Sequence, residues 1–281
     1  MDLSPFSPTR VRLLGADIDI ATADDVLRFT ARRIRQGRKG LVANHNAHSL
    51  ALLKKQPVMR AFYDRADLIE IDSTPMIAWA KIMGLPVRGA HRCTYLDWRE
   101  AFWSMAETLG WRVFYLGCAP GVAERAASKI KGQWPAVQLA THHGYFDHRP
   151  ASADNQAILA EINAFGPDVI FVGMGMPVQE AWIEQNFEAL TRGVVFSVGG
   201  AFDYEAGVQS TCPRWLGRIG LEWLYRFATQ PRRLFARYFI EPWGLAPAAI
   251  DDLRAVLARR KTRTSDISEW LTAIQPRSAR P

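Results

Sequence analysis

Polar side chains that could act on a ligand follow short apolar segments of this sequence. Asp72 comes directly after the run that ends at Ile71, and Asn44 and Asn46 follow residues 40–43. A carboxylate at the mouth of a crevice can act as a general base if its surroundings tune its pKa toward the working pH. The asparagine amides can bind sugar hydroxyls. Each position also has a structural interpretation, as a helix N-cap for Asp72 and as turn residues for the asparagines.

A second group of candidates lies between Pro167 and Gly207, where two apolar segments each run into glycines and then into polar residues. Glycine lets a ligand approach the backbone closely, so Gly175 and Gly199 are candidate ligand-binding positions. Gln179 could read a base or a ribose, or be a solvated helix residue. Asp203 could bind ribose or acceptor hydroxyls, or hold its own loop.

Two further positions extend this set. Gly117 ends the apolar run 111–116 and is a candidate for the same kind of ligand contact. Arg92 could clamp a phosphate or be an ordinary surface arginine.

Metal chemistry is not indicated. The six histidines have no convincing ligand spacing, and the three cysteines are widely separated, which fits a reducing cytoplasm without disulfides. Asp17-Ile18-Asp19 superficially matches a DxD metal motif, but a solvated face or a turn is the favoured interpretation. We therefore expect no metal and no cofactor.

The elements that must position these residues alternate along the chain. Apolar segments of strand length at 11–20, 40–43, 65–71, 111–116, 137–142, 169–172 and 194–198 alternate with helical patterns of about 10–15 residues. This alternation predicts an α/β fold, a Rossmann-like, doubly wound and mostly parallel sheet. Ligands bind such sheets in a crevice at the carboxyl ends of the strands, which is where the candidate residues fall.

The amino-acid composition of the sequence changes after Gly207. Between Cys212 and Phe239 six arginines are interleaved with aromatic and aliphatic residues, with Glu222 as the one acid; the arginines are Arg214, Arg218, Arg226, Arg232, Arg233 and Arg237. A basic, aromatic-rich helical segment can bind an anionic membrane surface or a pyrophosphate. The alternative is a helix that packs on the core with a solvated arginine face. We expect a catalytic domain at 1–208, this helical appendage at 209–260, and a disordered tail at 261–281.

Bulk properties narrow the function classes. The chain has 281 residues, 48% of them hydrophobic, and a net charge of +7, which favours an anionic partner. No segment reaches the roughly 18 apolar residues of a membrane span, and the N-terminus has no signal-peptide pattern. A nucleic-acid binder is disfavoured because aromatic residues and arginines cluster only in the tail and no known module is present.

Taken together, these residues resemble the WecG/TagA/CpsF family, glycosyltransferase family 26. The resemblance covers roughly Leu13 to Tyr238. It is carried by PDVIFVGMGMPVQEAWI, VGGAFDYEAG, FYLGCAPGVAERAA and TCPRWLGRIGLEWLYRFATQPRRLFARY, with support from Asn44-His45-Asn46, Asp72, and Arg92 before Thr94.

The resemblance implies an inverting, metal-independent transfer of a sugar from a UDP-sugar to a polyprenyl-diphosphate-linked saccharide in surface or exopolysaccharide biosynthesis. It implies that Asp72 is the base that deprotonates the acceptor, that Asn44 and Arg92 position the sugar and diphosphate, and that Gln179 and Asp203 line the donor pocket. The C-terminal arginines would contact the lipid diphosphate and the membrane. The expected place of action is the cytoplasmic face of the cell membrane, and a homo-oligomer is compatible with this interpretation.

Some residues depart from the family pattern. Ser73 stands where Gly is usual, Asn44 where Thr is common, Tyr95 where Gly is usual, and Cys212 where Ala is usual. The first three surround the expected sugar site, so the donor stays open between N-acetylmannosamine, glucose and a uronic acid. A non-catalytic UDP-sugar-binding protein of envelope assembly is the alternative function.

Overall fold

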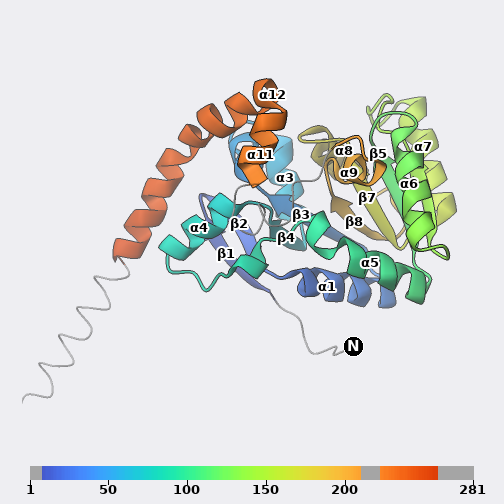
Figure 1. The fold of residues 1–281 in the computed structure, drawn as a ribbon, viewed down its shortest axis with the longest axis horizontal. Coiled ribbons are helices and arrows are strands. Elements are labelled where there is room, and N and C mark those ends of the chain that lie inside the picture. Colours follow the sequence, from blue (N-terminus) through green and yellow to red (C-terminus); the bar gives the residue numbers. More distant parts are fainter. Residues whose placement is uncertain (1–7, 210–221, 259–281) are drawn as a thin grey trace, which may run out of the picture.

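The structure of the chain is a computed structural model that describes residues 8–209 and 222–258. Six parallel strands form the central sheet in the order β4-β3-β8-β7-β5-β6, with helices on both faces (Figure 1). The strands of this sheet are β3 Gly40–His45, β4 Leu68–Ile71, β5 Arg112–Gly117, β6 Gln138–His142, β7 Val169–Gly173 and β8 Val194–Ser197. The predicted Rossmann-like α/β fold is confirmed.

The helices follow the strands in alternation. In the first part of the chain they are α1 Ala23–Arg35, α2 Ala47–Leu53, α3 Pro57–Arg65, α4 Thr74–Ile82, the short η1 Gly89–His91 and α5 Tyr95–Leu109. In the second part they are α6 Val122–Gln133, α7 Ala153–Phe165, α8 Val178–Asn186 and α9 Ala201–Ala206. The C-terminal segment consists of α11 Glu222–Thr229, α12 Pro231–Phe235, the π-helical η2 Ala236–Ile240, the 3₁₀-helical η3 Glu241–Leu245 and a helix over 246–258.

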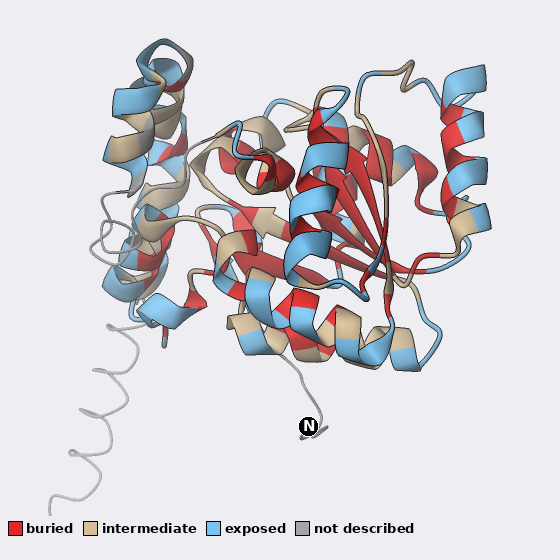
Figure 2. Ribbon diagram, turned by 45° about the vertical axis from the view of Figure 1, so that its right-hand side comes forward, coloured by how far each residue is buried: buried red, intermediate tan, exposed pale blue. Residues whose placement is uncertain are grey.

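The strands are apolar on both faces because the sheet is covered on both. Val169 to Val172 in β7 and Val194 to Phe196 in β8 are all at most 1% exposed. Side chains of α1, α5, α6 and α9 form one buried cluster with the sheet, and those of α3, α7 and α8 form the other. Figure 2 shows the buried strands between helices whose outer faces are exposed. This two-sided burial is typical of parallel sheets.

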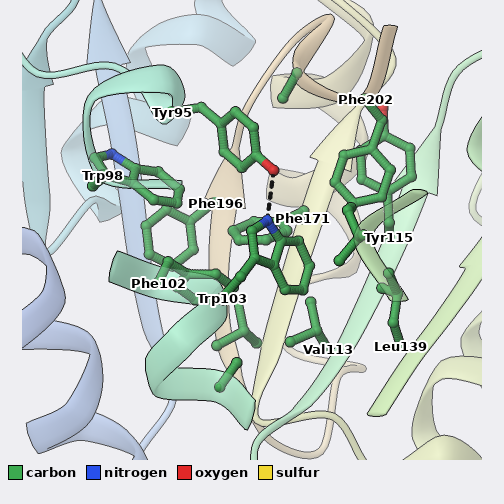
Figure 3. Close-up of a cluster of buried hydrophobic side chains, with 14 of the residues drawn as sticks. Tyr95, Trp98, Phe102, Trp103, Val113, Tyr115, Leu139, Phe171, Phe196 and Phe202 are labelled. Carbon is green, nitrogen blue, oxygen red and sulfur yellow. Dashed lines mark hydrogen bonds between the residues drawn. The ribbon is translucent and has the colours of Figure 1, made fainter. Parts of the chain in front are cut away.

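An aromatic cluster fills the space between α5 and the sheet (Figure 3). Trp98 packs 5.5 Å from the Phe196 ring and 5.9 Å from the Phe171 ring, measured between ring centroids. Trp103 Nε1 donates a hydrogen bond of 2.8 Å to the Tyr95 hydroxyl. These contacts fix the first turn of α5, which begins next to the carboxyl ends of the strands.

The first segment differs from the prediction. Residues 11–20 are not one strand of the main sheet but most of an antiparallel hairpin, β1 Thr9–Leu13 and β2 Ala16–Ile20. Leu14 and Gly15 adopt positive φ angles and turn the chain within this apolar run. Asp19 is buried, accepts two hydrogen bonds from Arg10 and one from the Ile69 backbone, and so ties the hairpin to β4.

The C-terminal segment returns to the core. Asp252, in the helix over 246–258, accepts hydrogen bonds of 2.9 Å from the Leu14 backbone N–H and from Trp79 Nε1. Lys54 Nζ donates to the Gly244 carbonyl at 2.7 Å. In Figure 1 this last helix lies beside α4 and the hairpin. Within the described residues, no helix is long and apolar enough to cross a membrane.

Candidate active site

A cavity of about 470 Å³ opens at the carboxyl edge of the sheet. Its described lining comes from the ends of β3, β4 and β8, the loop after β7, the start of α5 and the C-terminal segment. The lining residues used below are Asn44, Asn46, His48, Glu70, Asp72, Cys93, Thr94, Tyr95, Trp98, Gly175, Gln179, Gly199, Leu234, Arg237 and Glu241. Strand ends that are far apart in sequence therefore meet at one place, as a parallel sheet requires.

Asp72 stands at the carboxyl end of β4 and is partly exposed to the cavity. Its backbone N–H donates to the His45 carbonyl at 2.9 Å, which continues the strand pairing for one more residue. The N-cap of α4 is Ser73, so the interpretation of Asp72 as that cap is wrong. The side chain is thus at the cavity wall, where a carboxylate can accept a proton from a bound ligand.

Asn44 and Asn46 line the same wall, and both amides also hold the backbone. Asn44 Nδ2 donates to the Ser197 carbonyl at 2.6 Å, joining the ends of β3 and β8. Asn46 is the N-cap of α2: its Oδ1 accepts from the backbone N–H groups of His48 and Ser49. The turn interpretation therefore holds for Asn46, which nevertheless also faces the cavity.

Gln179 lines the cavity but is only 1% exposed, so the interpretation as a solvated helix residue is wrong. Its Oε1 accepts hydrogen bonds from the backbone N–H groups of Gly175, at 3.2 Å, and Gly199, at 3.1 Å. Its Nε2 donates to Glu180 Oε1 at 2.7 Å. Gln179 thereby ties together the two glycine loops, whose glycines have φ angles of 81° and 54° that favour glycine.

Three predicted ligand-binding residues lie outside the described cavity lining: Gly117, Arg92 and Asp203. Gly117 is a packing position, since a Cβ atom there would lie 2.4 Å from the Gly173 carbonyl oxygen. Arg92 Nη2 lies 3.4 Å from Asp97 Oδ1, and its backbone bridges to Ile71 beside the wall residues Cys93 and Thr94.

Asp203 lies in the first turn of α9, and its carboxylate is close enough to the Cys118 thiol to help raise the pKa of that thiol. Its backbone carbonyl accepts the N–H groups of Val208 and Gln209. These contacts match the expectation that Asp203 holds its own loop.

Two buried carboxyl groups escaped the sequence analysis. Glu70, on the wall, accepts a 3.2 Å hydrogen bond from Trp98 Nε1, and burial raises its pKa to about 8. Glu180 is fully buried behind Gln179, and burial raises its pKa to about 7. For Glu70 the available signal was an acid within an apolar run, because charged residues are seldom buried without a reason.

The C-terminal segment supplies the opposite wall. His48 Nδ1 lies 2.6 Å from Glu241 Oε2, and Arg237 Nη2 donates to Asn46 Oδ1 at 3.3 Å. Leu234 and Leu245 are buried, so the segment packs on the core, as the alternative interpretation held.

The remaining arginines of this segment differ in position. Arg232 is exposed on α12, Arg226 lies in α11 and Arg233 in α12. Arg214 and Arg218 fall outside the described residues.

Among residues 8–209 and 222–258, no three His, Cys, Asp or Glu side chains are grouped so that they could hold a metal ion. The described cavity wall instead combines two partly exposed carboxylates, Asp72 and Glu241, with several amides and an arginine. This combination suits the binding of a hydroxylated, anionic ligand.

Comparison with known proteins identifies the family. The Glycosyl transferase WecG/TagA/CpsF family profile matches residues 11–260, which is most of the chain. The chain belongs to this family and is a glycosyltransferase. Among its relatives are two proteins named N-acetylglucosaminyldiphosphoundecaprenol N-acetyl-beta-D-mannosaminyltransferase, from Staphylococcus aureus strains COL and MSSA476. Each is 26% identical over 235 residues, which are 80% of this chain and 87% of the relative.

Proposed function

We propose that this glycosyltransferase moves a sugar, with inversion and without a required metal ion, from a UDP-sugar to a polyprenyl-diphosphate-linked saccharide in surface or exopolysaccharide biosynthesis. The single observation that carries the proposal is the position of Asp72 in a cavity walled by strand ends on one side and a basic C-terminal segment on the other. The Staphylococcus aureus relatives are named for transfer to a diphosphoundecaprenol-linked sugar, which supports a lipid-linked acceptor.

In the proposed reaction, Asp72 accepts the proton of the acceptor hydroxyl as that oxygen attacks the anomeric carbon. The new carbon–oxygen bond forms as the bond from the anomeric carbon to the UDP phosphate oxygen breaks on the opposite face, which inverts the configuration. Asp72 is the more exposed of the two carboxyl groups, while burial raises the pKa of Glu70, two residues earlier, to about 8. Two nearby carboxyl groups with different environments can take different roles in this way.

The other wall residues have supporting roles in the proposal. Asn44 and Asn46 present amides to the sugar, and Gln179 holds the two glycine loops in the shape that receives the donor. Arg92, beside the wall and paired with Asp97, contacts the diphosphate once that ion pair opens. We place Asp203 and Gly117 behind the wall, where they maintain its shape.

We further propose that the C-terminal segment lies on the cytoplasmic face of the membrane. Large apolar side chains are exposed along it, with Trp243 79% and Leu257 63% exposed; the others above 40% are Leu224, Phe235, Phe239, Ile240, Ile250 and Leu253. Exposed aromatic and aliphatic residues in a basic segment are typical of helices that bind the interface of an anionic membrane. The segment would bring the lipid-linked acceptor to the cavity.

The test is an assay of UDP release with EDTA present, using a panel of UDP-sugars and a lipid-diphosphate-linked acceptor. We expect one donor to be turned over and the product to have inverted anomeric configuration. A ligand that binds only the folded state raises its apparent stability, so thermal protection by the same UDP-sugars identifies binding separately. Protection without turnover of any donor would favour a non-catalytic UDP-sugar-binding protein, and turnover abolished by EDTA would contradict metal independence.

A further inference from the structure

Glu70 occupies an unusual position for a carboxyl group. It is the third residue of β4, between Ile69 and Ile71, which are buried and apolar, and it is itself only 4% exposed. Successive strand residues face opposite sides of a sheet, so Glu70 points to the same side as Asp72, two residues later. Both side chains line the cavity, with Glu70 the more deeply buried.

The Glu70 carboxyl group is held in place by an indole N–H. Trp98 Nε1 donates to Oε1 at 3.2 Å, and the Cys93 thiol nearby acts to lower the pKa of Glu70 against the larger effect of burial. Trp98 is 2% exposed and is fixed by its contacts with Phe171 and Phe196 (Figure 3). Because its neighbours cannot shift easily, Glu70 presents a rigid polar group to the cavity.

The Trp98 N–H does not use the full hydrogen-bonding capacity of the group. A carboxyl group has two oxygens that accept up to about four hydrogen bonds, and in its neutral form it also donates one. Burial favours the neutral form, and the nearby Asp72 and Asp97 carboxyl groups act in the same direction. A buried carboxyl that merely satisfied one indole N–H would be an expensive choice in an apolar strand.

We propose that Glu70 is a specificity-determining residue that binds a hydroxyl or N–H group of the sugar placed beside Asp72. This inference rests on the transferase function proposed above and extends it to the choice of substrate. The hydroxyl or N–H group that contacts Glu70 could belong to the donor sugar or to the acceptor sugar, so both sugars are varied in the test. In either case the cavity selects for a polar substituent at the sugar position that meets Glu70.

Two variants separate a contact with substrate from a structural role. Glu70→Gln keeps an acceptor for Trp98 and a donor for the ligand, so it should retain selectivity. Glu70→Met matches the length of the side chain but offers the ligand no comparable hydrogen bond. A structural role would change kcat/KM for all substrates alike, and that common factor cancels when ratios are compared.

The experiment measures kcat/KM for the accepted donor and for its monodeoxy or deacetamido analogues, and then repeats the series on the acceptor sugar. For one analogue we expect the wild-type protein and Glu70→Gln to prefer the full substrate by about tenfold, and Glu70→Met to show a ratio near one. The series in which the ratio changes identifies donor or acceptor as the source.

Ratios in Glu70→Met that equal the wild-type ratios for every analogue would overturn the assignment. Thermal unfolding checks that the variants are folded; if Glu70→Met is not, Glu70→Thr takes its place, because it keeps a polar group in the strand that is too short to reach the ligand. A wild-type protein that turns over no donor would contradict the transferase function instead, so the two failures are distinct.

Discussion

The two walls of the cavity are built in different ways. The sheet wall consists of strand ends held by backbone pairing, as β4 pairs with β3, and the strand residues beside Glu70 are almost entirely buried. The wall from the C-terminal segment is held by a few polar contacts, such as His48–Glu241 and Arg237–Asn46, while much of its apolar surface faces outward. On the proposed function, the rigid sheet wall would carry the chemistry and the C-terminal wall would govern access by the acceptor.

The sharpest test of this division is Asp72→Asn. Removing the base should lower kcat by about 10²- to 10⁴-fold, because proton transfer to a positioned side chain contributes that much. The loss should be the same for a lipid-linked acceptor and for a water-soluble acceptor with a short alkyl chain. Asp64→Asn, an exposed carboxylate on α3, is the matched control. Full activity in Asp72→Asn would show that Asp72 is not the catalytic base.

The buried Glu180 behind the sheet wall gives a pH-dependent prediction. Its pKa is raised to about 7 in the folded protein, so the folded state holds this proton more tightly than the unfolded chain does. The contribution of Glu180 to stability therefore falls as the pH rises from about 4.5 through 7, by roughly 3 kcal/mol at most. Glu180→Gln should remove this slope and be the more stable protein at pH 8.

Urea unfolding at pH 5 and pH 8 measures this difference. His45, whose pKa burial lowers to about 3, has the opposite effect, since its contribution to stability is lost as the pH falls below about 6.5. The comparison between wild type and Glu180→Gln cancels the His45 contribution. If the free energy of unfolding depends on pH in the same way in wild type and in Glu180→Gln, the pKa of Glu180 is not raised in the folded protein and the prediction is wrong.

The membrane role of the C-terminal wall predicts a smaller, selective effect. Trp243 is 79% exposed, so Trp243→Ala should leave the free energy of unfolding nearly unchanged. Loss of its indole should weaken binding to vesicles of anionic phospholipid by about tenfold or more, given the area that the ring would bury. The KM for the lipid-linked acceptor should rise, whereas activity on the water-soluble acceptor should not change.

Leu109→Ala is the control for Trp243→Ala, because Leu109 is 56% exposed at the end of α5, away from the C-terminal segment. Equal vesicle binding by wild type and Trp243→Ala would contradict the proposed orientation on the membrane.

The contact between the two walls gives the smallest effect. The double-mutant cycle of His48→Ala and Glu241→Gln should yield a coupling energy of about 1 kcal/mol in urea unfolding, as for a half-buried, hydrogen-bonded pair. Loosening this contact should raise the KM for the lipid-linked acceptor a few-fold and leave kcat nearly constant. If kcat of the His48→Ala or Glu241→Gln variant fell as far as that of Asp72→Asn, the C-terminal wall would contribute to the chemistry and not only to acceptor binding.

The sequence allowed the parallel sheet to be predicted, because doubly covered strands are continuous apolar runs and each ends in glycine or a polar residue. The same logic placed Asp72, Asn44, Asn46 and Gln179 at one edge. The sequence pattern could not predict which partners the side chain at each position would hydrogen-bond. The amide of Gln179 turns toward two backbone N–H groups, which nothing in the local sequence indicates.

Partners that are distant in sequence explain the other differences. Glu70 meets Trp98, and Asp203 meets Cys118, only once the sheet has formed. Local patterning also could not separate the hairpin from a single strand, because Leu14 sits at a positive φ angle within an apolar run. Gly15 is a local signal of this turn, but an apolar residue such as Leu14 at a positive φ angle gives none.

One amide oxygen, Gln179 Oε1, accepts from the N–H groups of both glycine loops. Those two protons share one acceptor, so an opening motion that releases Gly175 also alters the environment of Gly199. The two amides should therefore exchange with solvent deuterium at related rates, although they are 24 positions apart. A ligand that contacts only one loop would slow exchange in both, which makes the pair a reporter of occupancy for the whole sheet wall.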